Sequence, residues 1–380
     1  MTYPHTPSAR VSGLFSELYI GLMSGTSLDG VDGVLMHHED GQWRTLAHAH
    51  RPFPPALRQA LLDLNTPGED ELHRSALAAQ ALAVVYATVV EAVCQQAQVP
   101  PAEVQAIGAH GQTVRHRPDQ GYTLQLNQPA LLAEITGITV VADFRSRDVA
   151  AGGQGAPLVP AFHRGVFGQA GRTVAVLNLG GISNLSILRA DGTTVGFDCG
   201  PANALMDHWC ERHTGQPYDH EGAWARSGHV LPALLEAMLD EPFLALAPPK
   251  STGRDLFHPQ WLATRLAASA VGAAPQDVQA TLAEYTALTC VQELSRHARD
   301  CGLLIVCGGG ALNRYLMERL QQLAPTVRVE SSDHHGLPPL QVEAAAFAWL
   351  AHQCVNGQTA SLPAVTGARG ERILGAIYPA

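Results

Sequence analysis

The chain has 380 residues, which is enough for two domains of ordinary size. Hydrophobic residues make up 46% and charged residues 15%, a composition that excludes an intrinsically disordered chain. The net charge of −10 argues against a nucleic-acid-binding protein, which usually presents a basic face. A negatively charged substrate would therefore need positive groups close to it.

The cysteines and apolar runs bear on where the protein works. The 7 cysteines are dispersed without a C-x-x-C pair, which predicts reduced thiols and neither a disulfide framework nor a zinc site. No signal peptide is visible, and the longest apolar run, 76–93, is interrupted by Gln80, Tyr86 and Glu91. We therefore expect a cytoplasmic protein with neither a membrane partner nor a nucleic-acid partner.

Apolar patterns predict the elements of the first half of the chain. The expected strands are 16–20, 34–36, 43–50, 104–109, 122–126 and 139–142. The expected helices are 54–64, 72–98 and 129–136. In the longest of them, a buried stripe is expected at Leu77, Ala81, Val85, Val89 and Val93.

The same patterns continue through the second half. The expected strands are 173–179, 184–188, 194–197, 303–306 and 327–330. The expected helices are 203–213, 232–239, 260–268, 277–298, 313–323 and 342–352. Strands followed by helices, twice over, predict two α/β domains. We expect 11–140 with the C-terminal segment 355–380 to form one domain, and 141–354 to form the other.

The stretch 21–33 reads G-L-M-S-G-T-S-L-D-G-V-D-G and lies between two predicted strands. Gly25 and Gly30 permit backbone angles that are closed to other residues, and they leave room for a ligand beside the main chain. The pattern indicates a strand-turn-strand with a glycine-rich bend. A glycine pair at 180–181 begins a second hairpin of the same kind.

Polar side chains in this stretch match the needs of phosphoryl transfer. The hydroxyls of Ser24, Thr26 and Ser27 lie beside bare backbone N–H groups, which suits a phosphate. Asp29 and Asp32 carry carboxylates that suit a divalent cation, bound directly or through its waters. The alternative is an ordinary hairpin turn, because glycine, serine and aspartate also favour turns.

Asp198 is the candidate catalytic residue. It lies at the end of an apolar strand in G-F-D-C-G-P, 196–201, where a carboxylate is well placed as a general base. The alternative is that Asp198 caps the helix that begins near Asn203. In the segment 249–255, Lys250 suits either a phosphate or a surface salt bridge, and so does Arg254.

Other polar residues follow predicted strands or open a helix. His110 and Gln112 follow one strand, and Asp143 and Arg145 follow another. Arg145 suits a carboxylate through a two-pronged hydrogen bond. Glu343 is a lone acid that opens an apolar helix. The alternatives are ordinary polar loops and a solvated glutamate at a helix N-terminus.

Two common nucleotide motifs are missing. There is no G-x-x-x-x-G-K-[ST] and no G-x-G-x-x-G after the first strand, so neither a Walker-type ATPase nor a Rossmann dehydrogenase is favoured. None of the 18 histidines stands in an H-E-x-x-H frame, so the sequence assigns no metal to histidine.

The motifs together resemble one family. G-L-M-S-G-T-S-L-D-G-V-D closely resembles the N-terminal signature of anhydro-N-acetylmuramic acid kinases, which belong to the sugar kinase, heat-shock ATPase and actin superfamily. L-N-L-G-G-I-S-N at 177–184 resembles the second phosphate loop of the family, and C-G-G-G-A-x-N at 307–313 resembles its adenosine loop. One departure is Cys199-Gly200-Pro201-Ala202, where the family usually has Thr-Gly-Pro-Gly. Matching segments otherwise run from Gly21 to Pro379 in the family order.

The resemblance implies a fold and an activity. It implies two duplicated actin-like or hexokinase-like domains around a central nucleotide cleft. It implies ATP-dependent conversion of 1,6-anhydro-N-acetylmuramic acid to N-acetylmuramic acid 6-phosphate, in peptidoglycan recycling, with Mg²⁺ as cofactor and a possible homodimer. A kinase of another sugar or small acid is the first alternative. The second is a non-catalytic, nucleotide-switched protein like actin or a chaperone.

The resemblance also implies the site residues. Asp198 is the catalytic base, and Mg²⁺ is held by Asp29 and Asp32 through water. The ATP-binding residues are Gly25, Thr26, Ser27, Leu28, Asp29, Gly30, Val31, Asp32, Gly180, Gly181, Asn184, Gly308, Gly309, Gly310 and Asn313. The sugar-binding residues are His110, Gln112, Asp143, Arg145 and Glu343.

Overall fold

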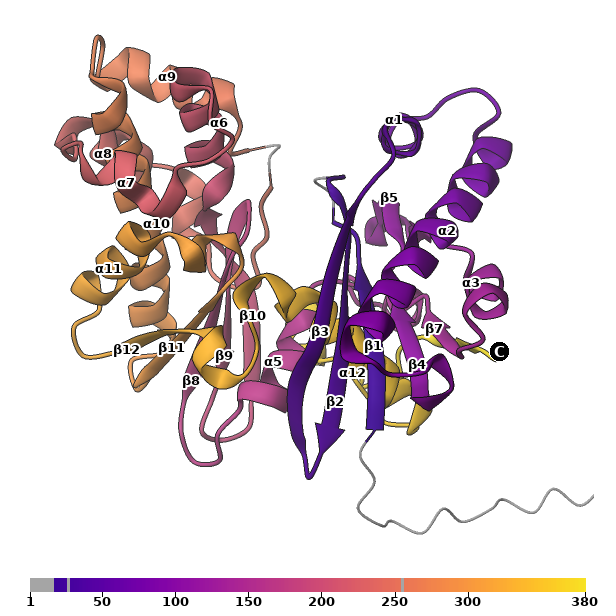
Figure 1. The fold of residues 1–380 in the computed structure, drawn as a ribbon. Coiled ribbons are helices and arrows are strands. Elements are labelled where there is room, and N and C mark those ends of the chain that lie inside the picture. The colour runs from indigo at the N-terminus through magenta and orange to yellow at the C-terminus, as the bar shows by residue number, and fades with distance from the viewer. Residues whose placement is uncertain (1–16, 26–27, 254–255) are drawn as a thin grey trace, which may run out of the picture.

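The computed structural model describes residues 17–25, 28–253 and 256–380. Its described residues form two large β-sheets and a separate two-stranded hairpin, with helices on the faces of the large sheets and two helices between them (Figure 1). The predicted α/β class is therefore confirmed. Thr26, Ser27 and Arg254, which the sequence singled out, lie outside the described residues.

The first sheet has six strands in the order β13-β7-β4-β1-β2-β3. β1, β2 and β3 are antiparallel neighbours, β4 and β7 continue the sheet parallel to β1, and β13 is antiparallel to β7. The strands are β1 (Glu17–Met23), β2 (Gly30–Glu39), β3 (Gln42–Pro52), β4 (Val104–Ala109), β7 (Val140–Ala142) and β13 (Ala376–Tyr378).

The second sheet repeats this plan in the order β10-β9-β8-β11-β12. β8, β9 and β10 are antiparallel neighbours, and β11 and β12 continue parallel to β8. The order and directions match β3-β2-β1-β4-β7, so the predicted duplication is confirmed. The strands are β8 (Val174–Leu179), β9 (Ile182–Leu188), β10 (Thr194–Pro201), β11 (Leu303–Cys307) and β12 (Arg328–Ser331).

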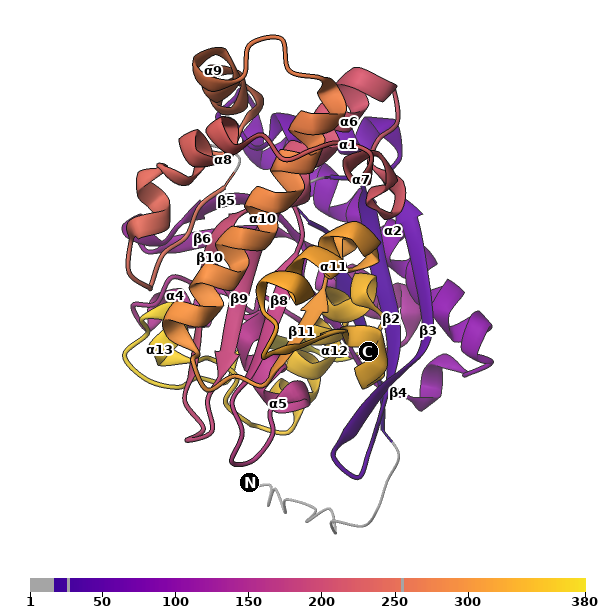
Figure 2. The ribbon, with the colours of Figure 1, turned by 90° about the vertical axis from the view of Figure 1, so that its left-hand side faces the viewer.

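Helices cover both sheets. α2 packs on one face of the first sheet, and α10 crosses a face of the second sheet (Figure 2). The helices of the first half are α1 (Pro55–Asp63), α2 (Glu71–Ala97), α3 (Pro129–Thr136), α4 (Ser146–Ala150) and α5 (Val159–Phe167). Those of the second half are α6 (Asn203–Thr214), α7 (Ala223–Arg226), α8 (Pro232–Leu239), α9 (Pro259–Ser269), α10 (Pro275–His297), α11 (Arg314–Leu323), α12 (Val342–Val355) and α13 (Pro363–Thr366).

α12 lies directly on the first sheet because two glycines admit it. Gly21 on β1 and Gly108 on β4 are partners in the parallel register. A Cβ atom at Gly21 would lie 1.9 Å from the carbonyl oxygen of Ala344, and one at Gly108 would lie 1.9 Å from that of Phe347. α12 therefore packs on the first sheet, whereas the predicted boundary assigned it to the second domain. Together with α5, it fills the space between the sheets with apolar side chains.

The buried face of α2 differs from the predicted stripe. Val89 and Val93 are buried as expected, but Leu77 is 52% exposed and Ala81 is also exposed. The buried face instead runs through Ala78, Ala79, Leu82, Ala83, Tyr86, Val89, Val90 and Val93. The exposed residues of the predicted stripe, Leu77 and Ala81, each lie one residue before a residue that packs on the sheet, Ala78 and Leu82. By length and composition alone α2 could cross a membrane, but half of its apolar window is buried inside the protein.

Some short elements were not predicted. β5 (Gln112–Arg117) pairs with β6 (Tyr122–Leu126) in a separate hairpin, although only the second strand was expected. α4 and α5 lie where the sequence indicated only a glycine-rich hinge. These elements are short, so local propensity carries little signal and tertiary contacts decide their conformation.

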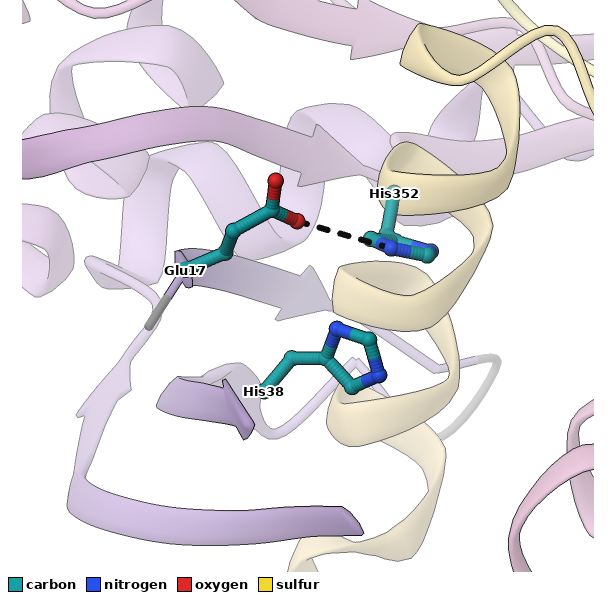
Figure 3. A group of neighbouring side chains, drawn as sticks. All are labelled: Glu17, His38 and His352. Atoms are coloured by element: carbon teal, nitrogen blue, oxygen red, sulfur yellow. Dashed lines mark ion pairs between the residues drawn. The ribbon is translucent and has the colours of Figure 1, made fainter. Parts of the chain in front are cut away.

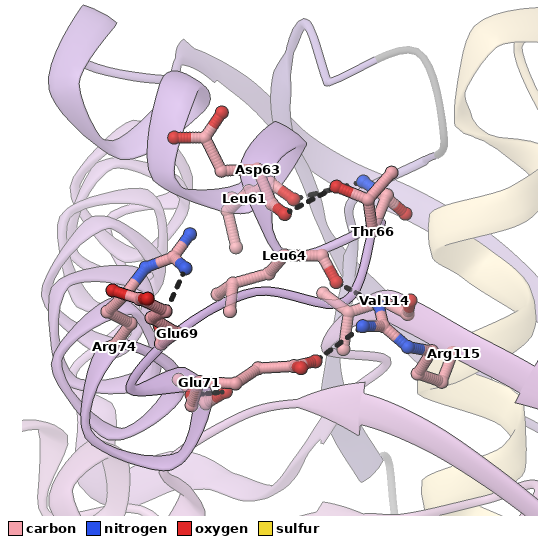
Figure 4. A network of polar contacts seen from close by, with 11 residues as sticks. Leu61, Asp63, Leu64, Thr66, Glu69, Glu71, Arg74, Val114 and Arg115 are labelled. Atoms are coloured by element: carbon pink, nitrogen blue, oxygen red, sulfur yellow. Dashed lines mark hydrogen bonds and ion pairs between the residues drawn. The ribbon is translucent and has the colours of Figure 1, made fainter.

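Arg115 on β5 ties this hairpin to the loop between α1 and α2 (Figure 4). It donates to the carbonyl oxygen of Leu64 and forms an ion pair with Glu71. We expect Arg115→Met to lower the free energy of unfolding by about 1–3 kcal/mol, because a partly buried carbonyl and a carboxylate both lose their partner. Arg117→Met is the matched control, since its pair with Asp119 is exposed to solvent and should contribute little to stability. Equal effects in urea denaturation would contradict this.

Candidate functional site

A row of polar side chains crosses the second sheet. Asn178 on β8 pairs in register with Asn184 on β9, and Asn184 pairs in register with Asp198 on β10. Directly paired residues of neighbouring strands point to the same face, so the three side chains form one row. The register of β10 shifts directly after Asp198, a bulge of the kind often found beside active sites.

Asp198 is held by the segment that follows Lys250. Its Oδ2 accepts hydrogen bonds from the backbone N–H of Thr252 at 2.9 Å and from the hydroxyl of Ser251 at 3.1 Å. Burial raises the pKa of Asp198, and these two hydrogen bonds oppose the rise. Because both bonds go to Oδ2, Oδ1 is the oxygen that is placed to take a proton.

The structure does not show Asp198 as a helix cap. α6 begins after Ala202 and has no side-chain cap. The backbone N–H groups of Ala202 and Asn203 donate instead to the carbonyl oxygens of Gly181 and Gly180, both at 3.0 Å. The glycine pair of the second hairpin therefore fixes the start of α6, and the carboxylate of Asp198 remains available for other chemistry.

The glycine-rich loop after β11 lies against β8. Gly308 has a φ of +77°, and a Cβ atom there would lie 2.4 Å from Oδ1 of Asn178. A Cβ atom at Gly310 would lie 2.5 Å from Cβ of Leu179. The close approach of the loop to β8 therefore requires glycine at both positions, and it brings the loop next to the polar row.

A pocket of about 530 Å³ opens beside this loop. Its lining includes Gly309, Asn313, Asn203 and Tyr218, and Tyr218 is more than half exposed. The side chain of Asn313 also caps α11 by accepting the N–H of Leu316 at 3.0 Å. The volume falls within the range of about 300–1,000 Å³ that is usual for small-molecule sites.

The glycine-rich bend of the first domain has a constrained backbone. Leu28 is buried and has a φ of +58°, a left-handed conformation that is uncommon for a branched residue. A Cβ atom at Gly30 would lie 2.2 Å from the carbonyl oxygen of Arg51 on β3. Val31 is buried in the sheet, whereas Asp29 is exposed. Asp29 is therefore exposed between two buried neighbours, Leu28 and Gly30.

Asp32 has two histidine neighbours that the sequence reading missed. Its Oδ1 lies 3.1 Å from Nε2 of His48 and 3.1 Å from Nδ1 of His50. The signal was present, because His48 and His50 alternate on β3 and side chains two residues apart share one face of a strand. One oxygen of Asp32 is therefore shared between two imidazoles.

His110 and Arg145 form a buried pair in the first domain. Nε2 of His110 accepts hydrogen bonds from Nε of Arg145 at 3.2 Å and from Nη2 at 2.9 Å, and its Nδ1 lies 3.3 Å from the carbonyl oxygen of Ser24. Burial and the charge of Arg145 lower the pKa of His110 to about 3, so the ring is neutral and its proton lies on Nδ1. In this structure, the fork predicted to bind a carboxylate therefore binds His110.

Two further predicted sugar-site residues lie near this pair in the chain. Gln112 is buried and donates Nε2 to the carbonyl oxygen of Gly25 at 3.1 Å. Its Oε1 has no hydrogen-bond partner among the described residues. Asp143 is exposed and has a φ of +57°, so its backbone is strained. Buried unpaired polar atoms and strained backbones are features that gather at functional sites.

The hydroxyl of Ser24 does not face a phosphate, contrary to the expectation from sequence. Ser24 is buried, and its hydroxyl donates to the carbonyl oxygen of Gly111 at 3.1 Å. Tyr86 completes a closed triangle, because its hydroxyl contacts Ser24 Oγ at 3.0 Å and accepts the N–H of Gly111 at 3.1 Å. The triangle fastens the bend to α2 and to the segment that carries His110.

Glu343 joins the two halves of the site. It lies in the first turn of α12, and its Oε1 accepts Nδ2 of Asn178 at 3.5 Å. Its side chain is open to solvent, but the protein around it raises its pKa by desolvation, an effect opposed by the charge of Arg145 and increased by that of Asp32. The charge of Glu343 in turn opposes the burial that lowers the pKa of Arg145 to about 10. Glu343 thus links Asp32 and Arg145 to the polar row.

Lys250 does not offset phosphate charge, and it is not part of a surface salt bridge. Its Nζ is buried and lies 3.3 Å from Oε1 of Glu293 on α10. The ammonium also donates to the carbonyl oxygen of Leu244 at 3.3 Å and lies 4.9 Å from the ring centre of Phe243. Lys250 therefore anchors the segment that holds Asp198.

Comparison with known proteins decides the family. A family model described as anhydro-N-acetylmuramic acid kinase matches residues 17–380. The chain belongs to the anhydro-N-acetylmuramic acid kinase family. A relative of that name from Variovorax paradoxus (strain S110) is 62% identical over 96% of this chain and 99% of its own length. Another, from Albidiferax ferrireducens, is 58% identical over 96% of this chain and 100% of its own length.

Similar solved structures are distant in sequence. An activator of 2-hydroxyisocaproyl-CoA dehydratase from Clostridium difficile with bound ADPNP has a TM-score of 0.45 and 10% identity, over 90% of this chain and 96% of that chain. A ROK family glucokinase from Streptomyces griseus in complex with glucose and AMPPNP has a TM-score of 0.40 and 14% identity, over 88% of this chain and 99% of that chain.

The two departures from the anhydro-N-acetylmuramic acid kinase motif differ in their backbone fit. Ala202 is buried and has a φ of −122° and a ψ of −111°, a pair outside the regions that residues other than glycine usually occupy, so its backbone is strained. Cys199 is also buried, and its pKa is raised by a hydrogen bond with Cys290 and by desolvation. Both residues therefore serve as packing beside Asp198.

The site also contains residues that the family motifs did not single out. Asn178, Ser251 and Thr252 stand inside segments that resemble the anhydro-N-acetylmuramic acid kinases, but no spacing in the sequence shows that they contact Glu343 or Asp198. Tyr86 carried no signal at all, because a tyrosine in an apolar helix has the pattern of a core residue.

Proposed function

We propose that this protein is an ATP-dependent kinase that opens 1,6-anhydro-N-acetylmuramic acid with water and phosphorylates O6. The products are N-acetylmuramic acid 6-phosphate and ADP, and the reaction serves peptidoglycan recycling. The observation that carries the proposal is the position of Asp198, whose pKa is raised by burial and whose Oδ2 accepts hydrogen bonds from Ser251 and Thr252. The full-length match to the family supports it.

In the proposed reaction, Asp198 Oδ1 takes a proton from a water molecule that attacks the anomeric carbon. The bond between that carbon and the bridge oxygen breaks, and the bridge oxygen stays on the sixth carbon of the sugar. It forms a new bond to the γ-phosphorus of ATP as the bond to the β,γ-bridging oxygen breaks, and ADP leaves. A base with a raised pKa is a stronger acceptor for the proton of water.

The sugar is proposed to lie between the two halves of the site. The charge of Arg145 acts on Glu343 and lowers its pKa, and Arg145 is positioned through His110. Its guanidinium has more N–H groups than its contacts to His110 and Gly155 use, so it retains donors for the lactyl carboxylate. Gln112 Oε1, Asp143 and Glu343 provide acceptors for sugar hydroxyl or amide groups.

ATP is proposed to span both glycine-rich hairpins, with its adenosine in the pocket beside Gly309 and Asn313. Asp29 is exposed, and the charge of Asp32 raises the pKa of Glu343. Negative charge therefore accumulates around Asp32 and Glu343, which favours a bound cation. Oxygen donors of this kind fit Mg²⁺, held by Asp29 and Asp32 through water. When bound, Mg²⁺ offsets charge on the phosphates.

We also propose that the protein is cytoplasmic and forms a homodimer. The exposed apolar residues of α2, among them Leu72 and Leu77, are consistent with a second copy on that face. Multi-angle light scattering of the purified protein measures the oligomeric state directly.

Mass spectrometry tests the reaction. The purified protein is incubated with ATP, Mg²⁺ and the anhydro sugar in ¹⁸O water. We expect one ¹⁸O at the anomeric carbon of a phosphorylated product and none in the new phosphate. Phosphorylation of glucose or another ordinary sugar at a comparable rate, with no product from the anhydro sugar, would instead favour a kinase of a different substrate.

Ser251→Ala is expected to shift the pH dependence of turnover. Activity requires the ionised form of Asp198, so turnover falls as pH drops through the raised pKa of that group. The hydroxyl of Ser251 stabilises the ionised form, and its loss should move the acid limb of the kcat profile to higher pH. Ser227→Ala, which removes an exposed hydroxyl that donates to the carbonyl of Trp224, is the control and should leave the profile unchanged.

A further inference from the structure

Glu17, His38 and His352 gather at the end of the first sheet that lies away from the glycine-rich bend (Figure 3). They come from the start of β1, the end of β2 and the last turn of α12. One carboxylate oxygen and one nitrogen from each ring lie within 4.8 Å of one another. Because more than 300 positions separate His38 from His352, no sequence motif could indicate this group.

The hydrogen bond at Nδ1 of His352 determines whether its other ring nitrogen, Nε2, carries a proton or a lone pair. Its Nδ1 lies 3.1 Å from Oε1 of Gln353, which is an acceptor. Nδ1 therefore carries the proton, and Nε2 presents a lone pair toward Oε2 of Glu17 at 3.5 Å. A second ring proton or a metal ion would satisfy this contact, and the nearby His38 supplies the further ligand that a metal ion needs. Histidines that bind metals usually donate their other ring N–H to an acceptor in this way.

Aromatic contacts fix the orientation of both rings. The ring of His38 stacks on Trp43 with centroids 4.6 Å apart and an interplanar angle of 23°. The ring of His352 meets Trp43 edge-on at 5.3 Å. Trp43 is itself buried, so it holds both imidazoles in place.

We propose that Glu17, His38 and His352 bind one divalent transition-metal ion of the zinc type, with water as the fourth ligand. Two imidazoles and one carboxylate are a common ligand set for Zn²⁺, whereas Mg²⁺ prefers oxygen ligands only. Bonds of about 2.0–2.2 Å place tetrahedral ligands about 3.3–3.5 Å apart, so small side-chain rotations close the group around the ion.

The proposed ion lies far from the reaction. Glu17 and Met23 are the two ends of β1, so the site is about 20 Å from the glycine-rich bend, at about 3.3 Å per residue. Along α12, His352 is about 14 Å from Glu343, at 1.5 Å per residue. The ion would fasten the last turn of α12 to β1 and β2, and through α12 it would steady Glu343. Its role is structural and distinct from that of Mg²⁺.

Zinc titration of the full chain tests the proposal. After removal of bound metal with a chelator, wild type is expected to bind one more Zn²⁺ per chain than His38→Gln or His352→Gln. Either variant should weaken binding at this site by at least about 10-fold. Wild type should also show a Tm rise with Zn²⁺ that Mg²⁺ at the same concentration does not reproduce. His334→Gln, which changes an exposed histidine, is the matched control and should bind as wild type does.

His38→Gln and His352→Gln should retain turnover with Mg²⁺ and ATP when Zn²⁺ is absent. Retained turnover shows that both variants fold. A Co²⁺ spectrum typical of four-coordinate nitrogen and oxygen ligands should appear in wild type and disappear in Glu17→Gln. The proposal is overturned if the Zn²⁺ stoichiometry is equal in wild type, His38→Gln and His352→Gln. It is also overturned if His334→Gln loses as much binding as they do.

Discussion

Asp198→Asn is expected to lower kcat by about 10²–10⁴-fold, the usual contribution of a positioned general base. The substitution keeps the size of the side chain and its ability to accept the N–H of Thr252. It removes the basicity that the proposed attack of water requires. Single-turnover kinetics with the anhydro sugar measure the loss. ATP binding, measured by calorimetry, should change little, because the proposed base lies on the sugar side of the γ-phosphate.

The control for this variant is Asp191→Asn. Asp191 lies in the exposed turn that joins β9 to β10 and accepts hydrogen bonds from Thr193, so its change removes one charge from the same hairpin outside the site. It should leave kcat near that of wild type. If Asp198→Asn keeps near wild-type turnover, or fails to bind ATP at all, then Asp198 has a structural or metal-binding role and the assignment of the base is wrong.

Much of the fold was predictable because its periodicities are strong. β8 and β11 are runs of apolar residues, which are typical of strands buried on both faces. How the two halves pack together was harder to predict from the sequence. The position of α12 depends on Gly21 and Gly108, whose partnership across two strands and whose clash with a helix backbone appear only in three dimensions.

The candidate site divides in the same way. Asp198 and the glycine-rich loops were predicted because each is local in sequence. Ser24 was misread, because a buried serine bonded to Tyr86 has the same sequence signature as one exposed to a ligand. Lys250 was also misread, since its partner Glu293 stands 43 positions later on another helix. A short motif shows that a residue is charged, but it does not show whether a distant residue already pairs with that charge.

Lys250→Met is expected to lower the free energy of unfolding by about 3 kcal/mol, the lower end of the usual effect of breaking a buried ion pair. The side chains of Lys250 and Glu293 are 2% and 3% exposed, so the substitution removes the buried cation that pairs with Glu293. Arg296 remains 2.7 Å from Glu293 and is half exposed, which limits the loss. Urea denaturation, monitored by the unfolding of the second domain, measures the change in the free energy of unfolding.

A double variant separates the loss of the pair from the penalty of the orphaned charge. Lys250→Met with Glu293→Leu replaces the ion pair by apolar groups, a change that is often nearly neutral in stability. We therefore expect the double variant to be more stable than Lys250→Met alone, by about 1–2 kcal/mol, a coupling of the size found between residues in contact. If Lys250→Met alone costs less than about 1 kcal/mol, water must reach Glu293 and the pair is not a buried one.

Because the backbone carbonyl of Lys250 accepts the N–H of Asp198 at 3.1 Å, the single variant should also lower kcat. The double variant should regain part of that loss, because the segment is held again.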